Sequence, residues 1–190
     1  ERLRTRIEAA RQGTTAALAV GDDPILAAEA VARYYLKHDF KPAWTGPTGP
    51  TPLADSLIAV LQNADKDGLS SKDYHTASLD SLRHALRAQA DAGAPVDPRA
   101  LADFELLCTD AFLLYGSHLL TGRVNPVEIT PTWNLAPRQA DLVERLEEAL
   151  DAVSIRAAFE RLRPPQPEYD ALRTALARYR ALAKQGGWPT

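Results

Sequence analysis

Apolar positions along this chain repeat mostly every three or four residues and rarely alternate. This spacing places apolar side chains on one face of a helix, whereas alternation would indicate a strand. The first such stretch follows Asp22-Asp23-Pro24, where acidic residues and a proline predict a helix start. Its expected face comprises Leu26, Ala30, Val31, Tyr34 and Tyr35. Two further faces are predicted at Leu53, Leu57 and Leu61 and at Leu79, Leu82, Leu86 and Ala90.

The strongest helical pattern runs from Arg99 to Leu120, after a start at Asp97-Pro98, and it ends at Gly122. One stripe of this helix consists of Leu101, Phe104, Cys108, Ala111, Phe112, Tyr115 and Leu119. Most of the remaining surface is also apolar, through Leu106, Leu107, Leu113, Leu114 and Leu120. A helix that is apolar nearly all round belongs at the centre of a bundle. We therefore expect Leu107, Phe112 and Leu114 to be buried.

Segments rich in proline and glycine interrupt these helical stretches. DFKPAWTGPTGPT reads as an extended piece through Trp44 followed by an exposed loop near 45–51, and VNPVEITPTWNLAP reads as irregular. Helices are expected at 142–150 and 155–162, then a last helix after Pro164-Pro165 and Pro167. One side of that helix carries Tyr169, Leu172, Leu176, Tyr179 and Ala183, and the other carries Arg173, Arg178, Arg180 and Lys184. The predicted fold is all-α, a multi-helix bundle around a central apolar helix with short irregular or extended connections.

Composition narrows the classes of function. The 190 residues fit one compact domain, residues 1–190, or two very small ones, and 45% are hydrophobic, which is enough for a real core. A net charge of −3 gives no basic footprint for nucleic acid, and one cysteine excludes an internal disulfide. The chain shows no initiator methionine, signal peptide or apolar run of about 18 residues. We interpret it as a piece of a longer protein, in which an upstream anchor or signal would not be visible.

Residues 63–74, NADKDGLSSKDY, resemble part of an EF-hand calcium loop. Asn63, Asp65 and Asp67 would be its first ligands, but the last position is Tyr74 where a bidentate glutamate is required. We interpret the stretch as a turn, in which Gly68 ends one helix in a left-handed conformation. Ser70 is then expected to cap the next helix, with Asp73 as its capping-box partner.

Few residues suggest chemistry. Cys108 lies on the most apolar stripe, which predicts a buried structural thiol rather than a nucleophile. His38, His75, His84 and His118 lack metal-ligand spacing. Asp110 interrupts the central helix, and we expect it to be buried and hydrogen-bonded to Arg123, a loop amide or a tyrosine hydroxyl; a role as general base is the alternative. No catalytic, cofactor or metal site is predicted.

Stretches in four regions together resemble one family. They are AVARYYLKHDFKPAW, DGLSSKDY, FELLCTDAFLLYGSHLLTGRVNP, and RPPQPEYDALRTALARYR followed by GGWP. In this order they are similar to the helical scaffold domain of large Gram-negative L,D-transpeptidases of the YcbB type. That family's "S-H-G-C-[IV]-R" cysteine motif does not occur in the chain, and Cys108 lies in CTDAF. The resemblance thus implies a fragment without transpeptidase activity, from a parent enzyme whose catalytic domain is of the YkuD type.

The resemblance implies a non-catalytic scaffold that positions downstream catalytic and peptidoglycan-binding domains for 3-3 crosslinking in the periplasm, with an inner-membrane anchor as an option. Its expected partners are those domains, and peptidoglycan is a second candidate. No nucleic acid is expected to bind, and the chain is expected to be a monomer. The candidate contacts, besides the basic side of the last helix, are Trp44, Arg123, Asn125, Trp133 and Trp188. Ordinary packing of at least two of these tryptophans is the alternative. A helical module that binds glycan or stem peptide directly is the alternative function.

Overall fold

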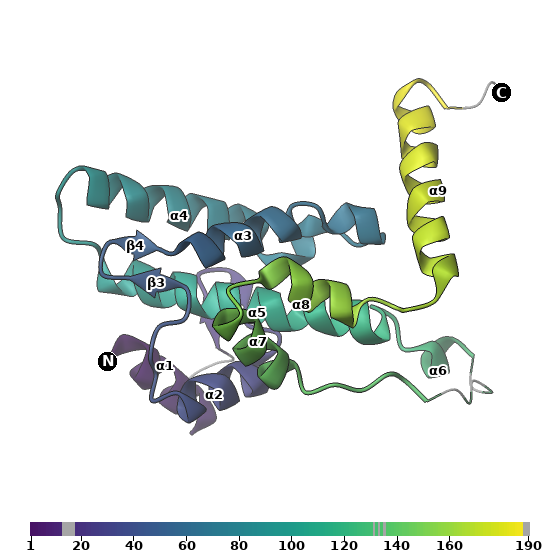
Figure 1. Ribbon diagram of the computed structural model, residues 1–190. Helices are drawn as coiled ribbons and strands as arrows, with labels where there is room; N and C mark the ends of the chain where they lie inside the picture. The colour runs from purple at the N-terminus through teal and green to yellow at the C-terminus, as the bar shows by residue number, and fades with distance from the viewer. Residues whose placement is uncertain (13–17, 131, 133, 135, 188–190) are drawn as a thin grey trace.

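The computed structural model describes residues 1–12, 18–130, 132, 134 and 136–187 and confirms an all-α fold (Figure 1). Its α-helices are α1 (Arg2–Arg11), α2 (Ala28–Lys37), α3 (Pro52–Leu61), α4 (Thr76–Asp91), α5 (Pro98–Thr121), α6 (Pro126–Ile129), α7 (Leu142–Asp151), α8 (Ile155–Leu162) and α9 (Pro167–Lys184). Two short 3-10 helices, η1 (Ala64–Asp67) and η2 (Ser71–Tyr74), connect α3 to α4. Within the described residues, no helix is long and apolar enough to cross a membrane.

Helix α5 forms the centre of the bundle, as predicted. It packs against α1, α2, α3, α4, α7 and α8 (Figure 1). The side chain of Asp97 accepts a hydrogen bond from the Arg99 amide at 2.9 Å, and Pro98 occupies the first turn, so the start is fixed locally. Leu107 and Phe112 are fully buried, whereas Leu114 is only half-buried against the core, which corrects that part of the prediction.

Close packing around α5 depends on aromatic rings and one glycine. The Phe112 and Phe159 rings lie 4.7 Å apart, and Tyr115 meets Phe159 edge to face at 4.8 Å. A methyl group at Gly116 would lie 3.2 Å from a Leu162 side-chain carbon, so an alanine there would require that side chain to move by a few tenths of an ångström. The aromatic pairs and this contact join α8 firmly to the central helix.

Two small antiparallel hairpins replace segments that were predicted otherwise. Strand β1 (Ala19–Val20) pairs with β2 (Asp23–Pro24), and β3 (Thr45–Gly46) pairs with β4 (Gly49–Pro50). The second hairpin lies in the predicted loop near 45–51. The first one overturns the helix start at Asp22-Asp23-Pro24, because α2 begins only at Ala28 and Leu26 is 61% exposed.

The delayed start of α2 has a physical reason. The carboxylate of Asp23 does not cap this helix; it accepts a hydrogen bond from Ser78 and lies beside His75. The amide of Ala27, just before the helix, instead donates to the distant carboxylate of Asp110 at 2.6 Å. A negative charge at a helix N-terminus is favourable wherever in the sequence it comes from.

The segment from 63 to 74 is a turn between helices. Gly68 adopts a left-handed conformation with φ 75°, as predicted. The predicted capping box is wrong, because the Ser70 side chain makes no cap hydrogen bond. Its backbone carbonyl accepts from the Asp73 amide at 3.1 Å, and this closes a single 3-10 turn.

Helix α9 projects from the bundle at the end opposite the α4–α5 connection (Figure 1). It packs on η1, and not one of its residues, all of which the structure describes, is buried. The predicted apolar face is therefore divided. Leu176 is half-buried near Gly68, whereas Leu172 is 68% and Tyr179 is 56% exposed.

Candidate functional site

The buried carboxylate of Asp110 was the most promising candidate for chemistry. It is fully buried and accepts the Ala27 amide at 2.6 Å, and the other carboxylate oxygen lies 2.7 Å from Nε2 of His75. The prediction of a buried, hydrogen-bonded Asp110 with a loop amide as partner is confirmed. The proposed pair with Arg123 is wrong, because Arg123 lies about 20 Å further along the chain and forms an ion pair with Asp73 at 2.9 Å.

His75 connects Asp110 to a second carboxylate. Its Nδ1 lies 3.4 Å from Asp23, which also accepts the Ser78 hydroxyl. Burial alone would lower the pKa of His75, but the hydrogen bond and charge of Asp110, supported by Asp23, raise it above the ordinary value. The serine contacts Asp23 rather than the imidazole, so these groups are not arranged as a nucleophile and its base. They hold α2, β2, η2 and α5 together.

Sequence reasoning missed a second buried carboxylate, that of Glu105, which is 1% exposed. It accepts hydrogen bonds from the Tyr35 hydroxyl at 2.7 Å, the Ala43 and Trp44 amides at 2.9 Å, and the Thr45 hydroxyl at 2.7 Å. Burial raises its pKa, and these hydrogen bonds offset part of that shift. Glu105 could have been predicted as a buried carboxylate from the same sequence signal as Asp110, namely a lone acid within an apolar helical stripe.

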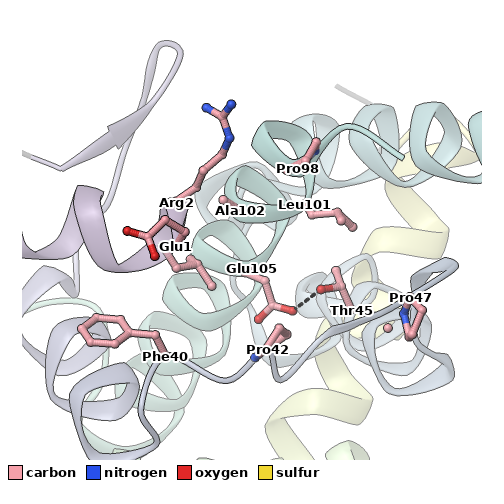
Figure 2. Close-up of a pocket in the computed structure, with 12 residues that line it drawn as sticks. Glu1, Arg2, Phe40, Pro42, Thr45, Pro47, Pro98, Leu101, Ala102 and Glu105 are labelled. Carbon is pink, nitrogen blue, oxygen red and sulfur yellow. Dashed lines mark hydrogen bonds between the residues drawn. The ribbon is translucent and has the colours of Figure 1, made fainter. Parts of the chain in front are cut away.

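Glu105 also lies beside the cavity shown in Figure 2, whose volume is about 830 Å³. Its walls come from α1, from the segment around Phe40 and Pro47, and from the first turns of α5 near Leu101. The dashed line in Figure 2 marks the hydrogen bond between Thr45 and Glu105. Four donors already occupy the carboxylate, so Glu105 is not available to act as a base or ligand in this cavity.

The other candidate groups have structural partners as well. Cys108 is fully buried, and burial raises the pKa of its thiol well above the usual range, which makes it a poor nucleophile. His38 lies 2.9 Å from Glu147, and His118 lies 2.9 Å from the Tyr74 hydroxyl. Across the described ranges, no group of three or more His, Cys, Asp or Glu side chains is placed to hold a metal ion.

Asp67, the third expected ligand position of the loop that resembles an EF-hand, has a structural role. Its side chain is 1% exposed and receives Arg163 through Nε at 2.9 Å and Nη2 at 3.0 Å. Tyr115 and Tyr169 donate their hydroxyls at 2.9 Å and 3.0 Å, and Nε of Arg173 lies at 2.8 Å. Burial alone would raise the pKa of Asp67, but Arg163 and the tyrosine hydroxyls lower it below the ordinary value. We call these five residues the Asp67 cluster.

The Asp67 cluster and η1 face one side of α9. On that side Leu176 lies 3.8 Å from the position of a Cβ at Gly68, and Arg180 donates to the backbone carbonyl of Asp65. The opposite side, which we call the outer face, consists of Ala171, Thr174, Ala175, Arg178, Tyr179 and Leu182, with the exposed Leu172 at its edge. A shallow groove of about 590 Å³ runs along most of it.

The predicted contact residues have different outcomes. Trp44 is fully buried and its Nε1 donates to Thr109 at 2.9 Å, so packing replaces the predicted partner contact. Arg123 is exposed but paired with Asp73. Asn125 is also exposed and caps α6, accepting from the Val127 amide at 3.2 Å. Trp133 and Trp188 lie outside the described residues.

The fold and these clusters define a helical domain with buried polar connections and a projecting helix. In a comparison with protein families, residues 29–176 match the family described as Scaffold domain. This match covers well over half of the chain, and the chain therefore belongs to the scaffold-domain family. Searches of curated proteins and of solved structures found no match.

Proposed function

We propose that this chain is the non-catalytic scaffold domain of a periplasmic cell-wall L,D-transpeptidase. In this role it positions the catalytic and peptidoglycan-binding domains of the same enzyme for 3-3 crosslinking. Membership of the scaffold-domain family supports the scaffold role, and the resemblance of the 30–44, 67–74, 104–126 and 163–189 segments supports the transpeptidase context.

One observation carries the docking role, namely the exposed leucine Leu172 on the projecting helix α9. Most of the stability of a helix in a protein comes from packing an apolar face against other elements. Here Leu172 is 68% exposed, so the bundle does not cover this leucine. We assign the outer face to the catalytic domain of the parent enzyme.

Charge specifies the surface that this partner should present. From Arg173 to Lys184 the helix carries four cations and no acid. Arg173 and Arg180 contact Asp67 and Asp65, whereas Arg178 lines the groove of the outer face. A partner with an apolar strip bordered by carboxylates would therefore match α9, and a basic surface would be repelled.

Photocrosslinking in the full-length parent protein tests this assignment. A photoreactive residue at Leu172, 68% exposed, should crosslink to the catalytic domain of the same chain. The matched control is Leu26, a leucine that is 61% exposed before α2 and that should give no such product. Equal crosslinking from both positions, crosslinking only between separate copies, or no interdomain product from Leu172 would refute the docking role.

A second assay tests the absence of activity and the alternative of direct binding. The 190-residue chain incubated with tetrapeptide stems should form no crosslinked dimers, and product abolished by Cys108→Ala would overturn the scaffold assignment. The chain should also remain in solution when insoluble peptidoglycan is pelleted. Sedimentation that Arg123→Ala removes would favour the peptidoglycan-binding module instead.

A further inference from the structure

We propose that Asp67 sets the direction in which α9 leaves the bundle. Only the purpose of this fixed direction rests on the proposed function, in which α9 meets its partner domain at a fixed angle. The residue lies at the last position of η1, which packs against α9, and its carboxylate contacts Tyr169 and Arg173 in the first two turns of that helix. Figure 1 shows α9 projecting from the bundle.

The Asp67 cluster joins three separate parts of the chain. Tyr115 comes from the central helix α5, Arg163 follows α8, and Tyr169 and Arg173 belong to α9. Arg163 binds both carboxylate oxygens through two different nitrogens, and this arrangement fixes the plane of the carboxylate. Once that plane is fixed, there are few orientations of α9 in which the Tyr169 hydroxyl still donates to Asp67 and the Arg173 guanidinium still pairs with it.

Charge makes Asp67 irreplaceable within the cluster. Two guanidinium groups, those of Arg163 and Arg173, lie against the same carboxylate, whose side chain is 1% exposed. Because this site is shielded from water, their mutual repulsion would be poorly screened without the negative charge between them. Loss of the charge would therefore push the start of α9 away from the bundle, besides removing hydrogen bonds.

The remaining contacts of α9 with η1 are weak determinants of angle. Leu176 meets the turn at Gly68, and Arg180 reaches Asp65, whose side chain is 59% exposed. No residue of α9, which the structure describes along its whole length, is buried. A buried, charge-assisted cluster thus outweighs an exposed ion pair, whose contribution to stability is small.

The experiment measures distances between spin labels in the 190-residue chain. Labels at Ala181 on α9 and at Ala88 on α4 or Glu144 on α7 report the angle of α9 from two sides, since all three positions are exposed. Ala181 lies about 21 Å along α9 from Pro167, so a swing of about 20° moves it by about 7 Å. The unchanged chain should give one narrow distance distribution for each pair.

Asp67→Asn should shift or broaden at least one of these distributions by several ångströms. Arg173→Ala, which removes the guanidinium that α9 pairs with Asp67 and leaves Arg163 and Tyr115 in place, should do the same while the Tm of the bundle stays near that of the unchanged chain. Asp65→Asn is the matched control, because it removes the neighbouring exposed carboxylate of η1, and it should leave both distributions unchanged.

Unchanged distances in both Asp67→Asn and Arg173→Ala would overturn the proposal, and so would equal broadening in Asp65→Asn. The measurement needs no partner, so its outcome is independent of the crosslinking from Leu172. If the distances broaden and that crosslink is absent, the orienting role of Asp67 holds and the docking role fails. The reverse result would leave α9 as a docking helix whose direction has another cause.

Discussion

Replacement of Asp110 by alanine removes the acceptor shared by two buried groups on different elements. The Ala27 amide, which donates at 2.6 Å, would lose its partner at the start of α2. His75 would lose its contact at 2.7 Å and keep only the longer approach to Asp23 at 3.4 Å. The fully buried position leaves no route for bulk water to replace the lost carboxylate.

Each buried polar group left without a partner costs about 1–3 kcal/mol. Two such groups, one of which keeps a weak second contact, give a loss of about 2–4 kcal/mol in the free energy of unfolding. Total stabilities of natural domains are about 5–15 kcal/mol, so this loss would be a large fraction. For a chain of this size, it corresponds to a fall in Tm of roughly 5–15 °C.

Urea unfolding followed by circular dichroism measures this loss, with Asp110→Asn as the matched comparison. The asparagine oxygen can still accept the Ala27 amide, and its amino group can donate to a neutral His75, so its penalty should be smaller at pH 8. At pH 6 that penalty should grow, because a protonated imidazole would face the amino group. A free energy of unfolding for Asp110→Ala within about 0.5 kcal/mol of the unchanged chain would show that the contacts around Asp110 do not support the fold.

Two further predictions concern the same bundle. The pKa of His75 in the folded chain is raised above its unfolded value of about 6.5, so the stability that His75 contributes is fully present below that value and is lost as pH rises through the folded pKa. The difference in unfolding free energy between the unchanged chain and His75→Gln should therefore shrink from pH 6 to pH 9. A constant difference would contradict the assignment. Leu107→Ala and Phe112→Ala should each lower the free energy of unfolding by about 2–5 kcal/mol in urea titrations. Leu172→Ala on α9 should change it by no more than about 0.5 kcal/mol. An equal effect at all three positions would argue against a core centred on α5.

The helices that the sequence predicted well carry their own start and stop signals. Helix α5 begins at Asp97 and Pro98 and ends before Gly122, which has φ 87°. Its apolar surface on nearly every side requires neighbours all round, and the structure provides them. The apolar pattern and the capping residues of α5 agree within this one segment, so the helix could be predicted without information from distant residues.

The start of α2 could not be predicted in this way. Asp23 and Pro24 look like a local cap, but the group at the N-terminus of this helix is Asp110, 83 residues beyond Ala27. A local sequence window contains no trace of that partner. The hydrogen-bond donors of Glu105 could not be predicted for the same reason, because they all come from residues that are at least 60 positions away.

The last helix shows a different limit. An amphipathic pattern predicts that one face will be covered, but it does not say whether the same domain covers it. The Asp67 cluster was also difficult to predict, because acidic residues around a glycine resemble a cation-binding loop. Only the arginine partners distinguish the two. Arg163 and Arg173 lie about 100 residues further on, and this separation removes them from any motif.

The three buried carboxylates, Glu105, Asp110 and Asp67, share an arrangement that fits a scaffold. Each contacts two or more groups from segments far apart in the sequence, and each therefore fixes the relative positions of elements that apolar packing alone could hold in more than one way. Burial of a charge adds little net stability, because desolvation offsets most of the attraction, but loss of one partner is costly. We interpret this as selection for a single geometry rather than for maximal stability. On that interpretation, Glu105 and Asp110 make the bundle rigid, and Asp67 transmits its orientation to α9, the helix on which the docking role depends.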